Sequence, residues 1–138
     1  TASSPSRPWV TATSRRFIPS RVRSLLASTG SRIDDEGVRL YSRLISDPAH
    51  VDGTLSMMAQ WSLDGLLARL PALDLPVLFV TGANDRAVPP QTSDRAAARM
   101  PAAEVVSIPG TGHLVHEEAA ERVAAVILPF LARHLPQV

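Results

Sequence analysis

The segment formed by residues 76–116 constrains the fold of this chain more than any other stretch. Residues 77–80 (VLFV) are β-branched and aromatic without polar alternation, which is typical of a parallel strand that is covered on both faces. The Ala-rich segment 91–100 predicts a crossover helix that ends at Pro101, and residues 105–108 (VVSI) predict a second strand. The pattern therefore predicts two neighbouring parallel strands, as in α/β proteins.

Each predicted strand is followed by a loop that contains one polar residue of a catalytic type. Four residues separate Asp85 from the first strand, and four separate His113 from the second. Catalytic groups of parallel sheets gather beyond the carboxyl ends of the strands, and an imidazole that acts as a base needs a carboxylate on its other nitrogen. We therefore predict that Asp85 and His113 form a pair. Taken singly, Asp85 would fit a turn and His113 a surface loop, and His116 is a nearby alternative to His113.

Two longer strings carry a resemblance to a known family. LPVLFVTGANDRAVPP and IPGTGHLVHEEAAERVAAVILPFL resemble the closing segment of α/β-hydrolases, in which the order along the chain is nucleophile, acid, histidine. By that resemblance Asp85 matches the acid, and His113, which follows Gly112, matches the histidine. Upstream, GVRLYSRLISDPAHVDGTLSMMAQWSLDGLLARLPAL resembles the cap segment of the magnesium-chelatase accessory proteins of bacteriochlorophyll synthesis, a branch of that superfamily.

The resemblance implies a partial α/β-hydrolase fold in three parts. Residues 1–19 are expected to be disordered or a ragged start, 20–70 a helical cap segment, and 71–138 the C-terminal part of the core with its last two parallel strands and C-terminal helix. No serine lies in a G-x-S-x-G pattern and the chain has no cysteine, so the family's nucleophile is missing. We expect a C-terminal half that is inactive alone, and of marginal stability because absent strands leave a sheet edge unpaired.

Four short helices are predicted ahead of the first strand. Apolar spacing and capping residues indicate helices over Ser20–Ser28, from Asp34 to before Pro48, over Pro48–Trp61, and from a Ser62 cap to Pro71. The expected apolar faces of these helices contain Val22, Leu25 and Leu26; Val38, Tyr41, Leu44 and Ile45; Val51, Leu55, Met58 and Ala59; and Leu63, Leu66, Leu67 and Leu70. The last helix is expected to begin at His116, with Pro129 kinking it or starting a separate last turn. Glu117 and Glu118 then fit the first turn of that helix, as acids that interact with its dipole.

One group of predicted helical residues suggests a binding surface. Met57, Met58 and Trp61 combine adaptable thioethers with a flat indole, which suits a large planar substrate such as a porphyrin. The alternative is that this stripe is ordinary core packing. His50 on the same segment has no partner at metal spacing, so we expect a surface or capping residue there.

Composition limits the remaining classes of function. An apolar fraction of 45% indicates a globular chain, and no apolar run approaches the roughly 18 residues of a membrane span. The absence of cysteine fits a reducing compartment such as the cytoplasm. The first thirty-two residues contain six arginines and no acid, a pattern that would also fit a transit peptide or contact with anionic lipid. The sequence has no P-loop, G-x-G-x-x-G, paired zinc spacing or nucleic-acid pattern, so no cofactor, metal or nucleic-acid partner is predicted.

Two functions follow from the resemblance. The first is an accessory protein that helps magnesium chelatase to insert magnesium into protoporphyrin IX, with a porphyrin as the small-molecule substrate and the chelatase as partner. The alternative is a serine hydrolase of esterase type, in which His113, oriented by Asp85, would activate a serine outside this chain to form an acyl-enzyme.

Overall fold

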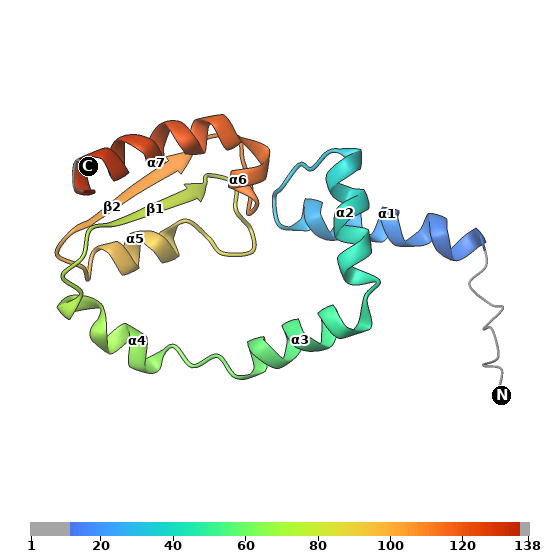
Figure 1. Ribbon diagram of the computed structural model, residues 1–138, viewed down its shortest axis with the longest axis horizontal. Coiled ribbons are helices and arrows are strands. Elements are labelled where there is room, and N and C mark those ends of the chain that lie inside the picture. The colour runs from blue at the N-terminus through green and yellow to red at the C-terminus, as the bar shows by residue number, and fades with distance from the viewer. Residues whose placement is uncertain (1–11, 136–138) are drawn as a thin grey trace.

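The computed structural model describes residues 12–135, in which helices flank a small parallel sheet (Figure 1). The elements in chain order are α1 (Ala12–Ser28), α2 (Asp35–Ile45), α3 (Pro48–Ala59), α4 (Asp64–Arg69), the 3-10 helix η1 (Leu70–Ala72), β1 (Val77–Gly82), α5 (Gln91–Ala97), β2 (Ala103–Ile108), α6 (Val115–Glu118) and α7 (Ala120–His134). No helix in this part of the chain is long and apolar enough to cross a membrane.

The predicted strand, crossover and strand are confirmed. β1 and β2 pair in parallel, with Val77 opposite Ala103 at one end and Gly82 opposite Ile108 at the other. Each strand is two residues longer than the apolar runs predicted, because a strand needs only backbone pairing and not an apolar side chain at its ends. Helices α5 and α7 lie on opposite faces of the sheet, as expected for strands without polar alternation (Figure 1).

Two small apolar clusters hold the described chain together. The first joins α1 to α2 through Val22, Leu26 and Val38, and Leu114 from the loop after β2 packs against it. The second lies between the sheet and the C-terminal helices and is built around Ile108, Val115 and Val123. Because Leu114 belongs to the loop that carries His113, the helical pair α1–α2 packs directly beside the carboxyl ends of the strands (Figure 1).

Several helix boundaries differ from the sequence-based expectation. Helix α1 begins at Ala12, eight residues before the expected Ser20, and contains Pro19, whose missing N–H costs one bond without ending the helix; residues 1–11 lie outside the described part. Helix α4 begins after Leu63 without a side-chain cap, so Ser62 does not cap it. At the C-terminus, the single helix expected from His116 is two helices, because α6 begins at Val115 and the backbone breaks at Ala119 before α7. Pro129 lies inside α7 and does not start a separate turn.

The expected apolar faces of α2, α3 and α4 are only partly buried. Val38 of α2 is in the core and Leu70 is buried at the end of α4, but Leu44 and Ile45 are exposed and α3 has no buried residue. Met57, Met58 and Trp61 are 49%, 51% and 64% exposed, so they are not core residues in this chain. Amphipathic spacing predicts which face of a helix is apolar. It does not predict whether another described element packs against that face.

Glycines pack backbone against backbone where the loops meet, and this packing gives a test of the fold. A Cβ on Gly82 would lie 2.0 Å from the carbonyl oxygen of Gly112, so we expect Gly82→Ala to lower the free energy of unfolding by about 1–3 kcal/mol or more. Urea denaturation measures the change. Gly53→Ala is the matched control: nothing lies within 4 Å of that position on α3, and alanine favours the helix there by about 0.5–1 kcal/mol. An unchanged urea midpoint for Gly82→Ala would contradict this packing.

Candidate active site

Asp85 is held by a tight turn at the end of β1. In the β1–α5 loop (residues 83–90), the N–H of Ala83 donates to Ile108 O at 3.0 Å, and the N–H of Asn84 donates to Thr111 O at 2.8 Å, so this loop is bonded directly to the loop after β2. One carboxylate oxygen of Asp85 accepts the N–H groups of Ala87 and Val88 at 2.8 and 2.9 Å. These contacts leave the other oxygen of Asp85 to face the β2–α6 loop (residues 109–114).

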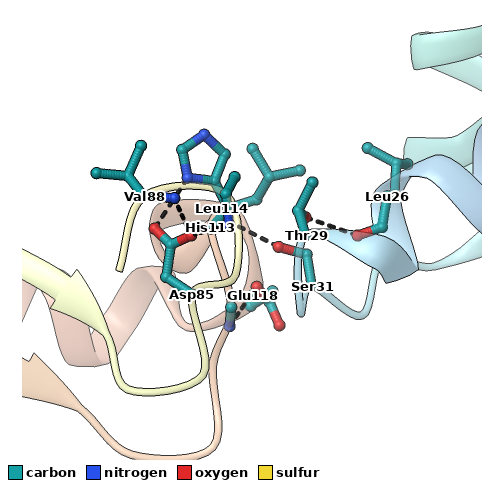
Figure 2. Close-up of polar contacts among 10 residues, drawn as sticks. Leu26, Thr29, Ser31, Asp85, Val88, His113, Leu114 and Glu118 are labelled. Atoms are coloured by element: carbon teal, nitrogen blue, oxygen red, sulfur yellow. Dashed lines mark hydrogen bonds and ion pairs between the residues drawn. The ribbon is translucent and has the colours of Figure 1, made fainter. Parts of the chain in front are cut away.

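His113 faces that second oxygen. Its Nδ1 lies 2.9 Å from Asp85 Oδ2, and the side chains of His113 and Asp85 are 40% and 10% exposed (Figure 2). Partial burial of Asp85 opposes its ionisation, but the hydrogen bonds from His113 and from the N–H groups of Val88 and Ala87 outweigh it and lower the pKa of Asp85. An ionised carboxylate only accepts hydrogen bonds, so Nδ1 of His113 carries the proton and donates it.

This arrangement determines which ring nitrogen of His113 could act as a base. In the neutral ring, a proton on Nδ1 leaves a lone pair on Nε2. Figure 2 shows this nitrogen pointing away from the other residues drawn. The geometry is that of the acid and histidine of a triad, with Asp85 fixing the tautomer and Nε2 available to accept a proton from a nucleophile.

A third loop, which joins α1 to α2 (residues 29–34), lies against the other two. Gly30, at φ +88°, approaches so closely that a Cβ on it would lie 2.0 Å from Asn84 O, and a Cβ on Gly112 would lie 2.2 Å from the carbonyl carbon of Gly30. The N–H of Arg86 donates to Thr29 O at 3.0 Å. The α1–α2 loop is thus a structural part of the site, although the sequence pattern predicts only that a helix ends just before it, at Ser28.

Two further side chains of the site were missed by sequence reasoning. Ser31, which is 3% exposed, accepts the N–H of Leu114 through its Oγ at 2.9 Å, and Glu118 accepts the N–H of Gly112 at 2.9 Å (Figure 2). Glu118 thus has a role beyond that of a first-turn acid. No local pattern connects residue 31 with residue 114, but the position of Glu118 five residues after His113, at the end of the short helix α6, is a signal that the sequence does contain.

The remaining candidate residues lie elsewhere. Nε2 of His116 lies 3.6 Å from Glu117 Oε1, and among the described residues no hydrogen bond or ion pair joins its side chain to Asp85 or His113. The N–H of His50 donates to the capping carboxylate of Asp47 at 3.4 Å. Met57, Met58 and Trp61 lie on or just after α3, whereas Asp85 and His113 lie in the loops that follow β1 and β2. Over residues 12–135 no group of three or more His, Asp or Glu side chains could hold a metal ion.

Comparisons with known proteins identify the family and the fold of this chain. Residues 2–126 match the family model of the alpha/beta hydrolase family. The chain is 47% identical over 111 residues to the magnesium-chelatase 30 kDa subunit of Rhodobacter capsulatus, which is 80% of this chain and 39% of that protein. It is 38% identical over 63 residues to esterase YbfF of Escherichia coli, covering 46% of this chain and 25% of the esterase. A serine hydrolase involved in carbazole degradation shares the fold, with a TM-score of 0.69 at 23% identity over 95% of this chain and 52% of that one.

The fold and the family match define the class of protein. The chain belongs to the α/β hydrolase family, and the predicted fold class is confirmed. Within that family it is similar to the magnesium-chelatase 30 kDa subunit, as its sequence resemblance predicted. The chain spans 39% of the length of that subunit and 25% of the length of the esterase.

The lowered pKa of Asp85 predicts a pH dependence of stability. An Asp ionises in the unfolded chain at about pH 3.9; because the pKa is lower in the folded chain, ionised Asp85 stabilises the fold above that pH, and this contribution disappears as the pH falls through the folded pKa. Asp85→Asn retains an oxygen for Ala87 and Val88 but removes the charge. We expect the free energy of unfolding of the wild type to exceed that of Asp85→Asn at neutral pH, and this difference to decrease below about pH 4. Urea denaturation across pH 3–7 measures it, and a constant difference would contradict the paired geometry.

Tyr41 tests the contact between α2 and α6. Its hydroxyl donates to Glu117 Oε1 at 2.5 Å, and burial, that hydrogen bond and the nearby charge raise the pKa of Tyr41 to about 12. Tyr41 is the one tyrosine of the chain, so an ultraviolet titration reports it alone. We expect half-ionisation near pH 12 instead of about 10, with stability lost as the pH rises between these values. Glu117→Gln should lower the midpoint only partway, because burial is the largest cause; an ordinary midpoint in wild-type chain with native circular dichroism would disprove the contact.

Proposed function

We propose that this chain is part of an accessory protein of magnesium chelatase that assists insertion of magnesium into a porphyrin during bacteriochlorophyll synthesis. One observation carries the proposal: 47% identity, over 80% of this chain, to a protein named as a magnesium-chelatase subunit. The solved serine hydrolase shares the fold at only 23% identity, which supports the scaffold and not a shared substrate. The substrate of the proposed protein is a porphyrin, and its partner is the chelatase.

The helical segment 20–70, which we propose as a cap, supplies a surface that suits a porphyrin. Its exposed apolar side chains include Leu55, Met57, Met58, Trp61, Leu63, Leu66 and Leu67. A cavity of about 310 Å³ at the end of this segment is lined by Leu66, Leu70 and Leu73 together with Arg69. Protoporphyrin IX combines a flat apolar ring with carboxylates, so thioethers and an indole would cover the ring while an arginine would bind a carboxylate.

A second candidate function rests on the catalytic-type pair. With Nδ1 of His113 donating to Asp85, Nε2 is ready to take a proton from a serine hydroxyl, as an esterase-type acyl transfer requires. Such a reaction also needs a nucleophile, which no serine of this chain provides in a G-x-S-x-G turn. The two proposals use the same scaffold and differ in whether the pair still performs chemistry.

A porphyrin titration beside an ester-turnover assay, both on the complete parent protein, separates the two proposals. We expect protoporphyrin IX to cause a saturable change in Soret absorbance and to quench tryptophan fluorescence, with no turnover of a chromogenic ester. Trp61→Phe and Met57→Ala should weaken binding several-fold because they remove contact area from the ring. Leu128→Ala, an equally exposed apolar residue on α7, is the matched control and should leave affinity unchanged.

The opposite pattern would overturn the accessory proposal. Ester turnover that is abolished by His113→Ala, without saturable porphyrin binding, would identify an ordinary hydrolase. Binding that is unaffected by Trp61→Phe and Met57→Ala would keep the accessory role but remove the proposed porphyrin surface on α3.

A further inference from the structure

The backbone on both sides of His113 is held by side chains from outside its own loop. The N–H of Leu114, in the peptide that directly follows His113, donates to Ser31 Oγ at 2.9 Å. The N–H of Gly112, the residue before His113, donates to Glu118 Oε1 at 2.9 Å (Figure 2). These two bonds bracket the residue whose ring must meet Asp85.

Glu118 also binds the loop that provides Ser31. Its second oxygen accepts the N–H of Arg32 at 2.9 Å, so one carboxylate bridges the α1–α2 loop and the β2–α6 loop. Ser31 and Arg32 are neighbours in sequence, and the two loops are therefore joined at two adjacent points. Charge-assisted bonds to backbone N–H groups are among the stronger hydrogen bonds in proteins, and an N–H left without its acceptor is costly when buried.

We propose that Ser31 and Glu118 are positioning residues for His113, and that through them the orientation of the imidazole depends on the α1–α2 loop. The direction of the His113 side chain is set by the backbone around its Cα, and the two bonds fix that backbone from opposite sides. The β1–α5 loop is tied to the same support, because Arg86 bonds to Thr29 and Gly30 lies against Asn84. The α1–α2 loop thus supports both loops of the pair, and the geometry of the His113–Asp85 contact depends on its position.

Through this dependence, the position of the helical segment affects the geometry of the catalytic-type pair. The α1–α2 loop is continuous with α2, and Tyr41 of α2 donates to Glu117, the neighbour of Glu118. Any displacement of α1 and α2 relative to the sheet, including one caused by a ligand on the segment that follows, is transmitted to the histidine through Ser31 and Glu118. The inference uses the Asp85–His113 pair, and it holds equally for the accessory and the hydrolase proposals.

Nuclear magnetic resonance on the complete parent protein reads the His113–Asp85 bond directly. Nitrogen-15 shifts of the imidazole report which ring nitrogen carries the proton, and a carbon-13 pH titration reports the pKa of Asp85. In Glu118→Ala and in Ser31→Ala we expect a mixture of tautomers in place of the Nδ1-protonated form. We also expect the pKa of Asp85 to rise toward its ordinary value, because that carboxylate loses the donor at Nδ1.

Matched controls separate positioning from a general loss of stability. Glu121→Ala removes an acid of α7 whose side chain makes no hydrogen bond with any described residue. Ser24→Ala removes a hydroxyl that donates to Ser20 O within α1. Both should keep the wild-type tautomer. Ser31→Thr retains the hydroxyl, so it should also show the wild-type tautomer of His113. Gly30→Ala, which displaces the α1–α2 loop without changing either positioning residue, should reproduce the Ser31→Ala result.

Each outcome supports or overturns the proposal. An unchanged tautomer and an unchanged Asp85 pKa in folded Glu118→Ala and Ser31→Ala would overturn it. If Glu118→Ala does not fold, the proposal is tested with other variants and the same two readouts, the His113 tautomer and the pKa of Asp85. These variants are Glu118→Gln, which keeps one acceptor oxygen, and Ser31→Ala compared with Ser31→Thr. None of these measurements involves porphyrin or ester, so failure of the positioning proposal and failure of the proposed function are distinguishable.

Discussion

The parallel pairing of β1 with β2 is the interaction on which the rest of the structure depends. Its register, which ends with Gly82 opposite Ile108, delivers the two following loops to the same edge of the sheet. From there the chain needs only one short turn after each strand to bring Asp85 and His113 within 2.9 Å. A slip of one residue in that register would displace one loop against the other, so the catalytic-type geometry is a consequence of backbone pairing before any side-chain contact is considered.

Close approach of glycine backbones adds the third loop. Gly82, Gly112 and Gly30 stack so tightly that a Cβ on any of them would meet backbone atoms within 2.2 Å. This packing lets the α1–α2 loop lie against both site loops and exchange hydrogen bonds with them, where larger side chains would hold the loops apart. The site is therefore built from three segments that are distant in sequence, and two of its supports, Ser31 and Glu118, act on the histidine from different sides.

Features that depend on short-range interactions could be predicted from the sequence, whereas features that depend on contacts between distant residues could not. The strands, the crossover and the pairing of Asp85 with His113 depend on local periodicity and on a general rule for parallel sheets, and residues 77–113 were sufficient to predict them. The contact of Ser31 with Leu114 depends on a separation of 83 residues, which no local pattern encodes. Likewise, spacing predicts which residues of α2 and α3 share an apolar face. Burial of Leu44 or Met58 depends on what packs against them, so their exposure could not be predicted from the helix alone.

That exposed surface has an energetic consequence. Among residues 18–135, eight apolar side chains are buried, while seven large apolar side chains on α3, α4 and the segment between them are exposed to solvent. Covering apolar surface contributes roughly 25 cal/mol per Å², so whatever covers this face, further protein or a flat apolar ligand, stabilises α3 and α4 before it stabilises the sheet. The sheet and its loops already have their own cluster around Ile108, Val115 and Val123. A ligand that binds the folded form alone would raise stability in proportion to the logarithm of its concentration, and the gain would be located in the helices that follow α2. Binding at the exposed face and support of His113 are thus physically connected through α2, at the point where Tyr41 meets Glu117.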